Sequence, residues 1–163
     1  MTVMDEPDWA RWRPNQSAVL CFVIRGSRLL LIHKKLGLGA GKITAPGGRI
    51  QEGEAPADAA CRETHEETGV NPLEVSRAGE LFFQFADGLA LHCTVFVSRR
   101  STGMPRETDE AVPFWVEPSS VPYPGMWADD ELWMPWMLAE KPFRGYFLYE
   151  GEKMLSGRVE PAE

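Results

Sequence analysis

The stretch GRIQEGEAPADAACRETHEETGV, residues 48–70, decides the fold of this chain because it predicts one helix with clearly marked ends. Pro56 suits the first turn of a helix, where its missing N–H is not needed, and Gly69 suits the position just after the end. We therefore predict a helix over residues 56–68. When the helix is projected at about 100° per residue, small side chains gather on the side expected to pack against a sheet, namely Ala57, Cys61, Thr64 and Thr68.

Three glutamates, Glu63, Glu66 and Glu67, share another side of this helix at spacings of three and four residues. Like charges at these spacings destabilise a helix by about 0.2–0.5 kcal/mol per pair, and the helix dipole disfavours acids in its second half. A divalent cation would reverse each effect, because clustered carboxylates are ligands that Mg²⁺ prefers. The alternative interpretation is a solvated acidic surface. We expect the preceding loop to bring Glu54 over as a fourth carboxylate.

The charged residues and glycines of this stretch follow the spacing Gly48-x5-Glu54-x7-Arg62-Glu63-x2-Glu66-Glu67-x-Gly69-Val70. This pattern resembles the Nudix box, the motif of hydrolases that cleave nucleoside diphosphates linked to another group. The resemblance implies a Nudix-like α/β/α sandwich, a mixed sheet with helices packed on it. Thr64 departs from the pattern, since an aliphatic residue is usual there, and we expect this change to affect packing rather than chemistry.

The resemblance also implies roles for the residues of the box. Glu63 and Glu67 ligate Mg²⁺, with Mn²⁺ as the alternative ion, and Glu66 is a further ligand or the base. Arg62 pairs with a carboxylate of the box and orients it. Gly48 allows a tight turn before the helix. The implied metal site is Gly48, Glu63, Glu66, Glu67 and Glu110, and the implied catalytic residues are Arg62 and these four glutamates.

Segments outside the box resemble one branch of this family, the animal MutT-homologue type of oxidised purine nucleoside triphosphate diphosphatase. They are residues 34–42, 107–110, 126–133 and 141–147, and the likeness covers about Ser17–Val159. Enzymes of this branch convert 8-oxo-dGTP or 2-hydroxy-dATP to the monophosphate and pyrophosphate, and so sanitise the nucleotide pool. In this branch the acid at the position of Glu110 is an additional metal ligand or base.

A purine pocket needs a flat apolar platform and a few polar groups at its edge. Trp127 supplies the platform, and the adjacent carboxyl groups of Asp129 and Asp130 are candidates to read the base edge. Burial and mutual repulsion should raise the pKa of one of them, and a proton that switches between them would admit two oxidised purines. The alternatives are that Asp129 is only a helix N-cap and Trp127 only a core or rim aromatic. The remaining predicted substrate-binding residues are Lys34, Leu38, Thr44, Gly47 and Gly48.

Two positions depart from this branch on the side that reads the base. Thr44 stands where the branch has an Asn that contacts the base edge, and a Thr hydroxyl offers fewer directed hydrogen bonds. Leu38 stands where the branch has a Phe that lines the pocket. These changes keep other substrates of the family open, namely ADP-ribose, a dinucleoside polyphosphate, a methylated purine triphosphate or a capped RNA end. A non-catalytic nucleotide sensor is a further alternative, which the complete set of glutamates disfavours.

The rest of the chain predicts a sheet and a second helix. Strands are expected at the apolar runs 17–24, 28–33, 81–85, 89–98, 112–117, 144–149 and 153–159, of which the first two and the last two form hairpins. Residues 36–42 predict a loop, and residues 46–48 predict a break. A second helix is expected from Asp129 to about Glu140, kinked or split at Pro135. Strands mixed with two helices indicate an α/β or α+β fold.

A length of 163 residues fits a single domain, with residues 1–16 as a polar lead-in and residues 160–163 as a frayed tail. The net charge of −7 disfavours a polymeric nucleic acid as partner. Nothing approaches the roughly 18 apolar residues of a membrane span. Three widely spaced cysteines fit a reducing cytosol, and two of them lie in apolar runs expected in the core. We therefore expect a cytoplasmic protein, most simply a monomer.

Overall fold

The structure, a computed structural model, describes residues 4–163. Within this range there are nine strands, two α-helices and two short 3-10 turns. In chain order they are β1 (Gln16–Arg25), β2 (Arg28–Lys34), β3 (Ile43–Thr44), β4 (Gly47–Arg49), α1 (Pro56–Thr68), β5 (Asn71–Phe85), β6 (Ala90–Thr102), β7 (Ala111–Val116), η1 (Pro118–Ser120), η2 (Tyr123–Gly125), α2 (Asp130–Leu138), β8 (Phe143–Glu150) and β9 (Lys153–Pro161).

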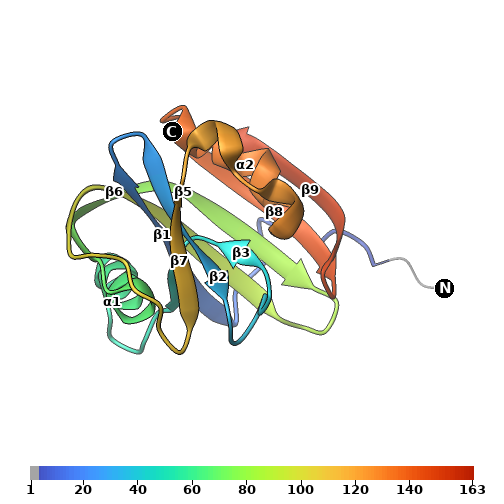
Figure 1. Cartoon of the computed structure of the whole chain (residues 1–163). Coiled ribbons are helices and arrows are strands. Elements are labelled where there is room, and N and C mark those ends of the chain that lie inside the picture. Colours follow the sequence, from blue (N-terminus) through green and yellow to red (C-terminus); the bar gives the residue numbers. More distant parts are fainter. Residues whose placement is uncertain (1–3) are drawn as a thin grey trace.

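The strands form a mixed sheet with a helix at either side (Figure 1). The sheet order is β3-β2-β1-β6-β5-β8-β9, while β4 pairs with β1 and β7 pairs with β2. The β1–β6 and β5–β8 pairs are parallel and the others are antiparallel. Trp133 and Met134 of α2 belong to one apolar core, and Ala59 and Ala60 of α1 belong to a second. The predicted class, a mixed sheet with helices packed on it, is confirmed.

The first predicted hairpin is present only at its turn. Strands β1 and β2 pair through Ile24 with Leu29 and through Arg25 with Arg28. Beyond these two pairs the strands diverge, because β1 continues between β6 and β4 while β2 pairs with β7. This divergence opens the space in which the cavity described below lies.

Helix α1 has the predicted bounds, but its buried side is rotated from the predicted one. Gly69 ends the helix in the left-handed conformation, with φ of 81°, and its N–H bonds the carbonyl of His65. The predicted buried residues Ala57 and Cys61 are only half-buried. The buried residues are Ala59, Ala60, Thr64, Glu67 and Thr68. The projection placed Glu67 with Glu63 and Glu66 on a side apart from the buried one, and the structure buries Glu67 against the sheet.

One strand was not predicted, and another was predicted too short. Residues 47–49 form β4, antiparallel to β1, where a break was expected over residues 46–48. Strand β5 starts at Asn71, ten residues before the predicted run, and carries register shifts between Pro72 and Gly79. These irregularities explain the miss, because a bulged strand loses the alternation of apolar and polar residues that reveals a strand.

Helix α2 continues through Pro135 and ends at Leu138, so the expected split is wrong. The last hairpin, β8 and β9, is confirmed. Strand β9 runs to Pro161, two residues into the segment expected to fray. Strands β5 and β6 form a further antiparallel hairpin, with Gly88 in the turn between them.

The polar lead-in is anchored on the sheet. The ring of Trp9 lies 5.3 Å from that of Tyr146, and the Trp12 Nε1–H donates to Oε1 of Gln84 at 2.8 Å. Cys21 and Cys93 are buried, as predicted. No helix within residues 4–163 is long and apolar enough to cross a membrane.

Candidate active site

Three of the predicted carboxylates come together at one place. Glu63 and Glu67 project from α1, and Glu110 directly precedes β7. One oxygen from each of the three carboxylates lies within 4.8 Å of the others. Glu66 is exposed and stands outside this cluster, as does Glu54. We call Glu63, Glu67 and Glu110 the acidic cluster.

Glu67 is the buried member of the acidic cluster. Glu67 is 3% exposed, and its Oε1 accepts a hydrogen bond from the backbone N–H of Gly47 at 2.8 Å. Burial, together with the negative charges of Glu63 and Glu110, raises the pKa of Glu67 to about 8. The hydrogen bond from Gly47 and the charge of Lys34 oppose this rise. A buried acid with such neighbours is expected to release its proton when a cation binds beside it.

Glycine is required at position 48 because the side chain of Glu63 lies close to the backbone there, and not because the chain turns. Gly48 lies in β4, outside the left-handed conformation that some other glycines of the chain adopt. A Cβ atom at Gly48 would lie 2.5 Å from Cδ of Glu63. The predicted tight turn is therefore wrong, and the reason for glycine is the close approach of a carboxylate to the backbone.

Arg62 joins the loop before α1 to the helix, as the sequence predicted. Its guanidinium binds both carboxylate oxygens of Glu54, at 2.7 and 2.9 Å, and Oε1 of Glu63 at 2.8 Å. A weaker contact of 3.3 Å reaches Glu66. Hydrogen bonding from Arg62 lowers the pKa of Glu54 to about 2. Both carboxylate oxygens of Glu54 are thus occupied by Arg62, and Arg62 also orients Glu63.

The donors of the acidic cluster suit a hard divalent cation. Carboxylate oxygens from α1 and from the segment before β7 converge, and like charges at this distance repel unless a cation lies between them. Burial also raises the pKa of Glu63, while Arg62 opposes that rise. The three glutamates are therefore the residues of the described chain best placed to hold such an ion.

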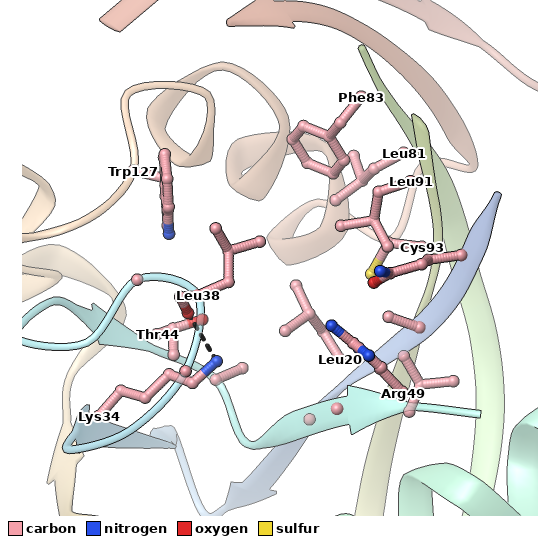
Figure 2. A pocket seen from close by; sticks show the side chains of 18 of the residues that line it. Leu20, Lys34, Leu38, Thr44, Arg49, Leu81, Phe83, Leu91, Cys93 and Trp127 are labelled. Atoms are coloured by element: carbon pink, nitrogen blue, oxygen red, sulfur yellow. Dashed lines mark hydrogen bonds between the residues drawn. The ribbon is translucent and has the colours of Figure 1, made fainter. Parts of the chain in front are cut away.

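A cavity of about 410 Å³ runs from Glu67 of the acidic cluster to an aromatic end. Its acidic end is lined by Gly47, Gly48 and Glu67, and its aromatic end by Trp127, Asp129 and Asp130. Figure 2 shows Trp127, Leu38, Thr44 and Lys34 on one side, with Phe83, Leu81 and Leu91 opposite. Every predicted substrate-binding residue lines this one cavity, namely Lys34, Leu38, Thr44, Gly47, Gly48, Trp127, Asp129 and Asp130.

Sequence reasoning missed part of the wall. Leu81, Phe83 and Phe85 line the cavity from alternate positions of β5, and Arg49 lines it from β4. The alternation in β5 was a usable signal, because residues two apart share one face of a strand. Nothing in the local sequence distinguishes Arg49 from an ordinary surface base.

Asp129 and Asp130 are buried, with 2% and 6% of their surface exposed. Oδ1 of Asp129 accepts from the Tyr149 hydroxyl at 2.5 Å, and Oδ2 accepts from Trp133 Nε1–H at 2.8 Å. Asp129 makes no side-chain capping bond to α2, so the N-cap alternative is wrong. Burial raises the pKa of Asp130 well above its ordinary value, and the neighbouring Asp129 raises it further.

Trp127 forms one wall of the cavity and is held by its neighbours. Its ring meets the rings of Tyr149 and Phe85 edge to face, at 5.3 and 6.2 Å. The ammonium of Lys42 lies 5.2 Å from the ring centre. A Cβ at Gly39 would lie 2.7 Å from Nε1 of Trp127, so the loop over residues 36–42 needs glycine there. Trp127 is half-buried and faces the cavity, which disfavours a purely core role.

Comparison with known proteins agrees with this geometry. The family model described as the NUDIX domain matches residues 14–137, about three quarters of the chain. The chain belongs to the Nudix family. The resemblance found in residues 48–70 is thereby confirmed.

Two Nudix relatives and one solved structure are similar over most of their length. The oxidized purine nucleoside triphosphate hydrolase of Danio rerio is 39% identical over 137 residues, covering 83% of this chain and 88% of the relative. The protein of that name in Mus musculus is 34% identical over 134 residues, covering 82% and 86%. The crystal structure of the MutT protein from Bacillus halodurans matches with a TM-score of 0.80 at 25% identity, covering 91% of this chain and 99% of that one.

Proposed function

We propose that this Nudix protein is a Mg²⁺-dependent diphosphatase of oxidised purine nucleoside triphosphates, with 8-oxo-dGTP and 2-hydroxy-dATP as the leading candidates. The products would be the nucleoside monophosphate and pyrophosphate. The observation that carries the proposal is that one cavity joins the acidic cluster to Trp127 and the carboxyl pair. The relatives in zebrafish and mouse, named for hydrolysis of oxidised purine triphosphates, support the same substrate class.

The acidic cluster would hold the metal ion. Glu63, Glu67 and Glu110 supply three carboxylates, and the backbone of Gly48 lies against Glu63. When bound, Mg²⁺ or Mn²⁺ would polarise the phosphates and lower the pKa of a water molecule. Glu66, exposed beside the cluster, is then available as a further ligand or as the base that takes a proton from water.

Positive groups at the acidic end suit the phosphate chain. Lys34 lines the cavity and donates to the carbonyl of Leu38 at 2.7 Å, and its charge acts on Glu67. Arg49 lines the same end. We propose that these two bases neutralise the triphosphate while the acidic cluster binds the cation, because a nucleotide with Mg²⁺ carries both signs of charge.

The aromatic end suits a purine. Trp127 offers a ring for stacking, and Phe83 and Phe85 close the opposite wall. Asp130 presents a carboxyl group whose raised pKa favours the neutral form, which both donates and accepts hydrogen bonds. Such a group reads a base edge that also carries donors and acceptors.

A second candidate keeps the reaction and changes the substrate. Thr44 and Leu38 line the cavity where a longer amide and an aromatic ring would fill it further. The room they leave suits a nucleoside diphosphate derivative such as ADP-ribose, a dinucleoside polyphosphate, a methylated purine triphosphate or a capped RNA end. That the protein acts as a cytoplasmic monomer stays a prediction.

A substrate panel under one Mg²⁺ concentration tests the proposal. We expect kcat/KM for 8-oxo-dGTP or 2-hydroxy-dATP to exceed that for dGTP by at least about tenfold, with pyrophosphate released. ADP-ribose as the best substrate would favour the second candidate. Thermal stabilisation by nucleotide without any product would instead indicate the non-catalytic sensor.

A further inference from the structure

The hydroxyl of Tyr149 lies against both the backbone and the side chain of Asp129. It accepts the backbone N–H of Asp129 at 3.1 Å and donates to Oδ1 of the same residue at 2.5 Å. A phenol has a single proton, and an N–H can only donate. The proton of Tyr149 is therefore directed to the carboxylate by the backbone itself.

The second oxygen of Asp129 also faces a fixed donor. Nε1–H of Trp133 donates to Oδ2 at 2.8 Å, and an indole nitrogen never accepts. Burial raises the pKa of Asp129, and the hydrogen bonds from Tyr149 and Trp133 oppose that rise. For Asp130, burial and the neighbouring carboxylate of Asp129 raise the pKa, and a smaller effect of hydrogen bonding from Trp133 opposes that rise. Because both oxygens of Asp129 already accept from fixed donors, a proton shared by the pair is better accommodated on Asp130.

The other ionisable groups that face this pair do not favour moving the proton from Asp130 to Asp129. Lys42 favours an ionised Asp130, but its effect on the pKa is smaller than those of burial and of Asp129. Burial raises the pKa of Tyr123 and that of Cys93, so both remain neutral near pH 7. No group on the facing elements reverses the assignment among the residues described.

We propose that Tyr149 is a positioning residue, which holds Asp129 as a permanent acceptor and leaves Asp130 as the only member of the pair that donates to a base. Tyr149 is fully buried and acts through Asp129. The sequence suggested a proton that moves between the two carboxyl groups, and this contact opposes such movement. The cavity then reads purine edges in one donor–acceptor order.

A fixed order of donor and acceptor in the carboxyl pair distinguishes between the bases of 8-oxo-dGTP and 2-hydroxy-dATP. In this respect the inference rests on the proposed function. Guanine carries an acceptor oxygen at position 6, whereas adenine carries a donor amino group there. A pair with its proton fixed suits one arrangement and leaves the other with two donors or two acceptors face to face. Mismatched polar groups in a buried site cost selectivity.

Tyr149→Phe tests the proposal through a ratio of substrates. We expect the wild-type kcat/KM values for 8-oxo-dGTP and 2-hydroxy-dATP to differ by at least about tenfold, and the variant to narrow that difference about tenfold. In Tyr149→Phe, kcat/KM of the poorer substrate should rise mainly because its KM falls. The matched control is Tyr146→Phe, which removes a hydroxyl from the same strand where the ring stacks on Phe82 at 5.0 Å, away from the cavity. An equal loss on both substrates, or a wild type that uses both equally well, overturns the proposal.

A measurement without substrate separates this inference from the proposed function. In protein labelled with ¹³C at the aspartate carboxyl carbon, we expect the NMR signals near pH 7 to show Asp130 protonated and Asp129 ionised, with Asp129→Asn and Asp130→Asn providing the assignments. In Tyr149→Phe the two signals should move toward a shared proton. A proton on Asp129 in the wild type overturns the inference even if purine triphosphates are hydrolysed. The expected spectrum would support the role of Tyr149 even if the substrate class proves wrong.

Discussion

The backbone N–H of Gly47 donates a hydrogen bond of 2.8 Å to the carboxylate of Glu67, which joins the short strand β4 to helix α1 at the most buried point of the acidic cluster. This bond holds an acid in a place where burial alone would push it toward the neutral form. The strand and the helix therefore present Glu67 as a ligand ready for a cation.

Turnover should depend on the negative charge of Glu67. Glu67→Gln keeps an oxygen that can accept from Gly47 but removes the negative charge, so we expect a folded protein whose kcat with Mg²⁺ falls at least about 100-fold. Pyrophosphate release measures the activity and circular dichroism the fold. Glu74→Gln is the matched control, because Glu74 is exposed and pairs with Arg100 at 2.9 Å, away from the acidic cluster. Activity within tenfold of the wild type in Glu67→Gln would rule out Glu67 as a metal ligand.

The raised pKa of Glu67 also predicts how stability depends on pH. Between the ordinary carboxyl pKa of about 4.5 and the folded value of about 8, the folded state binds more protons than the unfolded state. The free energy of unfolding of the metal-free protein therefore falls as pH rises through this window. We expect Tm to drop by at least about 3 °C, which corresponds to about 1 kcal/mol for a domain of this size. Thermal melts in EDTA at pH 5 and pH 8 provide the measurement.

The same melts contain their control. Glu67→Gln has no proton to lose at this position, so the drop in Tm between pH 5 and pH 8 should shrink in that variant. Mg²⁺ binds the ionised carboxylate and should raise the Tm of the wild type most at pH 8. An identical pH dependence in wild type and variant would show that Glu67 titrates normally.

The sequence predicted the helix and its charges because both depend on local patterns. Pro56 and Gly69 mark the ends of α1, and the spacing of Glu63 and Glu67 places both carboxylates on the same side of the helix. The arrival of Glu110 from another element is a long-range contact, which no local pattern contains; it was expected only from the family resemblance. The same holds for the hydroxyl of Tyr149, which reaches Asp129 because β8 and α2 pack together.

Gly48 shows a different limit, in which the residue was identified correctly and the reason was not. Glycine in a sequence indicates either a special backbone angle or a close approach, and the two are indistinguishable without coordinates. We expect Gly48→Ala to displace the Glu63 carboxylate, since the added Cβ would lie 2.5 Å from its Cδ. The Mg²⁺ concentration for half-maximal activity should rise at least about tenfold. An unchanged Mg²⁺ requirement would mean that Glu63 takes no part in metal binding.

Arg62 should matter for the geometry of the site more than for its charge. Lysine lacks the planar fork that binds both oxygens of Glu54 and also reaches Glu63, so Arg62→Lys should weaken metal binding about 10–100-fold. The measurement is the Mg²⁺ dependence of kcat/KM. Arg99→Lys is the matched control, because Arg99 makes an exposed pair with Glu140 on another part of the surface. Equal effects in the two variants would argue against an orienting role for Arg62.

Trp127 allows the base end of the cavity to be tested apart from the metal end. Its ring is held edge-on by Tyr149 and faces the cavity, so removing it in Trp127→Ala takes away stacking that is worth about 1–3 kcal/mol for a nucleic-acid base. KM for an oxidised purine triphosphate should therefore rise about 5- to 150-fold, whereas the Mg²⁺ requirement should stay the same because the acidic cluster is untouched. Trp127→Phe, which keeps a smaller ring, should recover part of the loss. Trp9→Ala, on the lead-in against Tyr146, is the control for a tryptophan outside the cavity. A fall in kcat with unchanged KM in Trp127→Ala would mean that this ring does not bind the base.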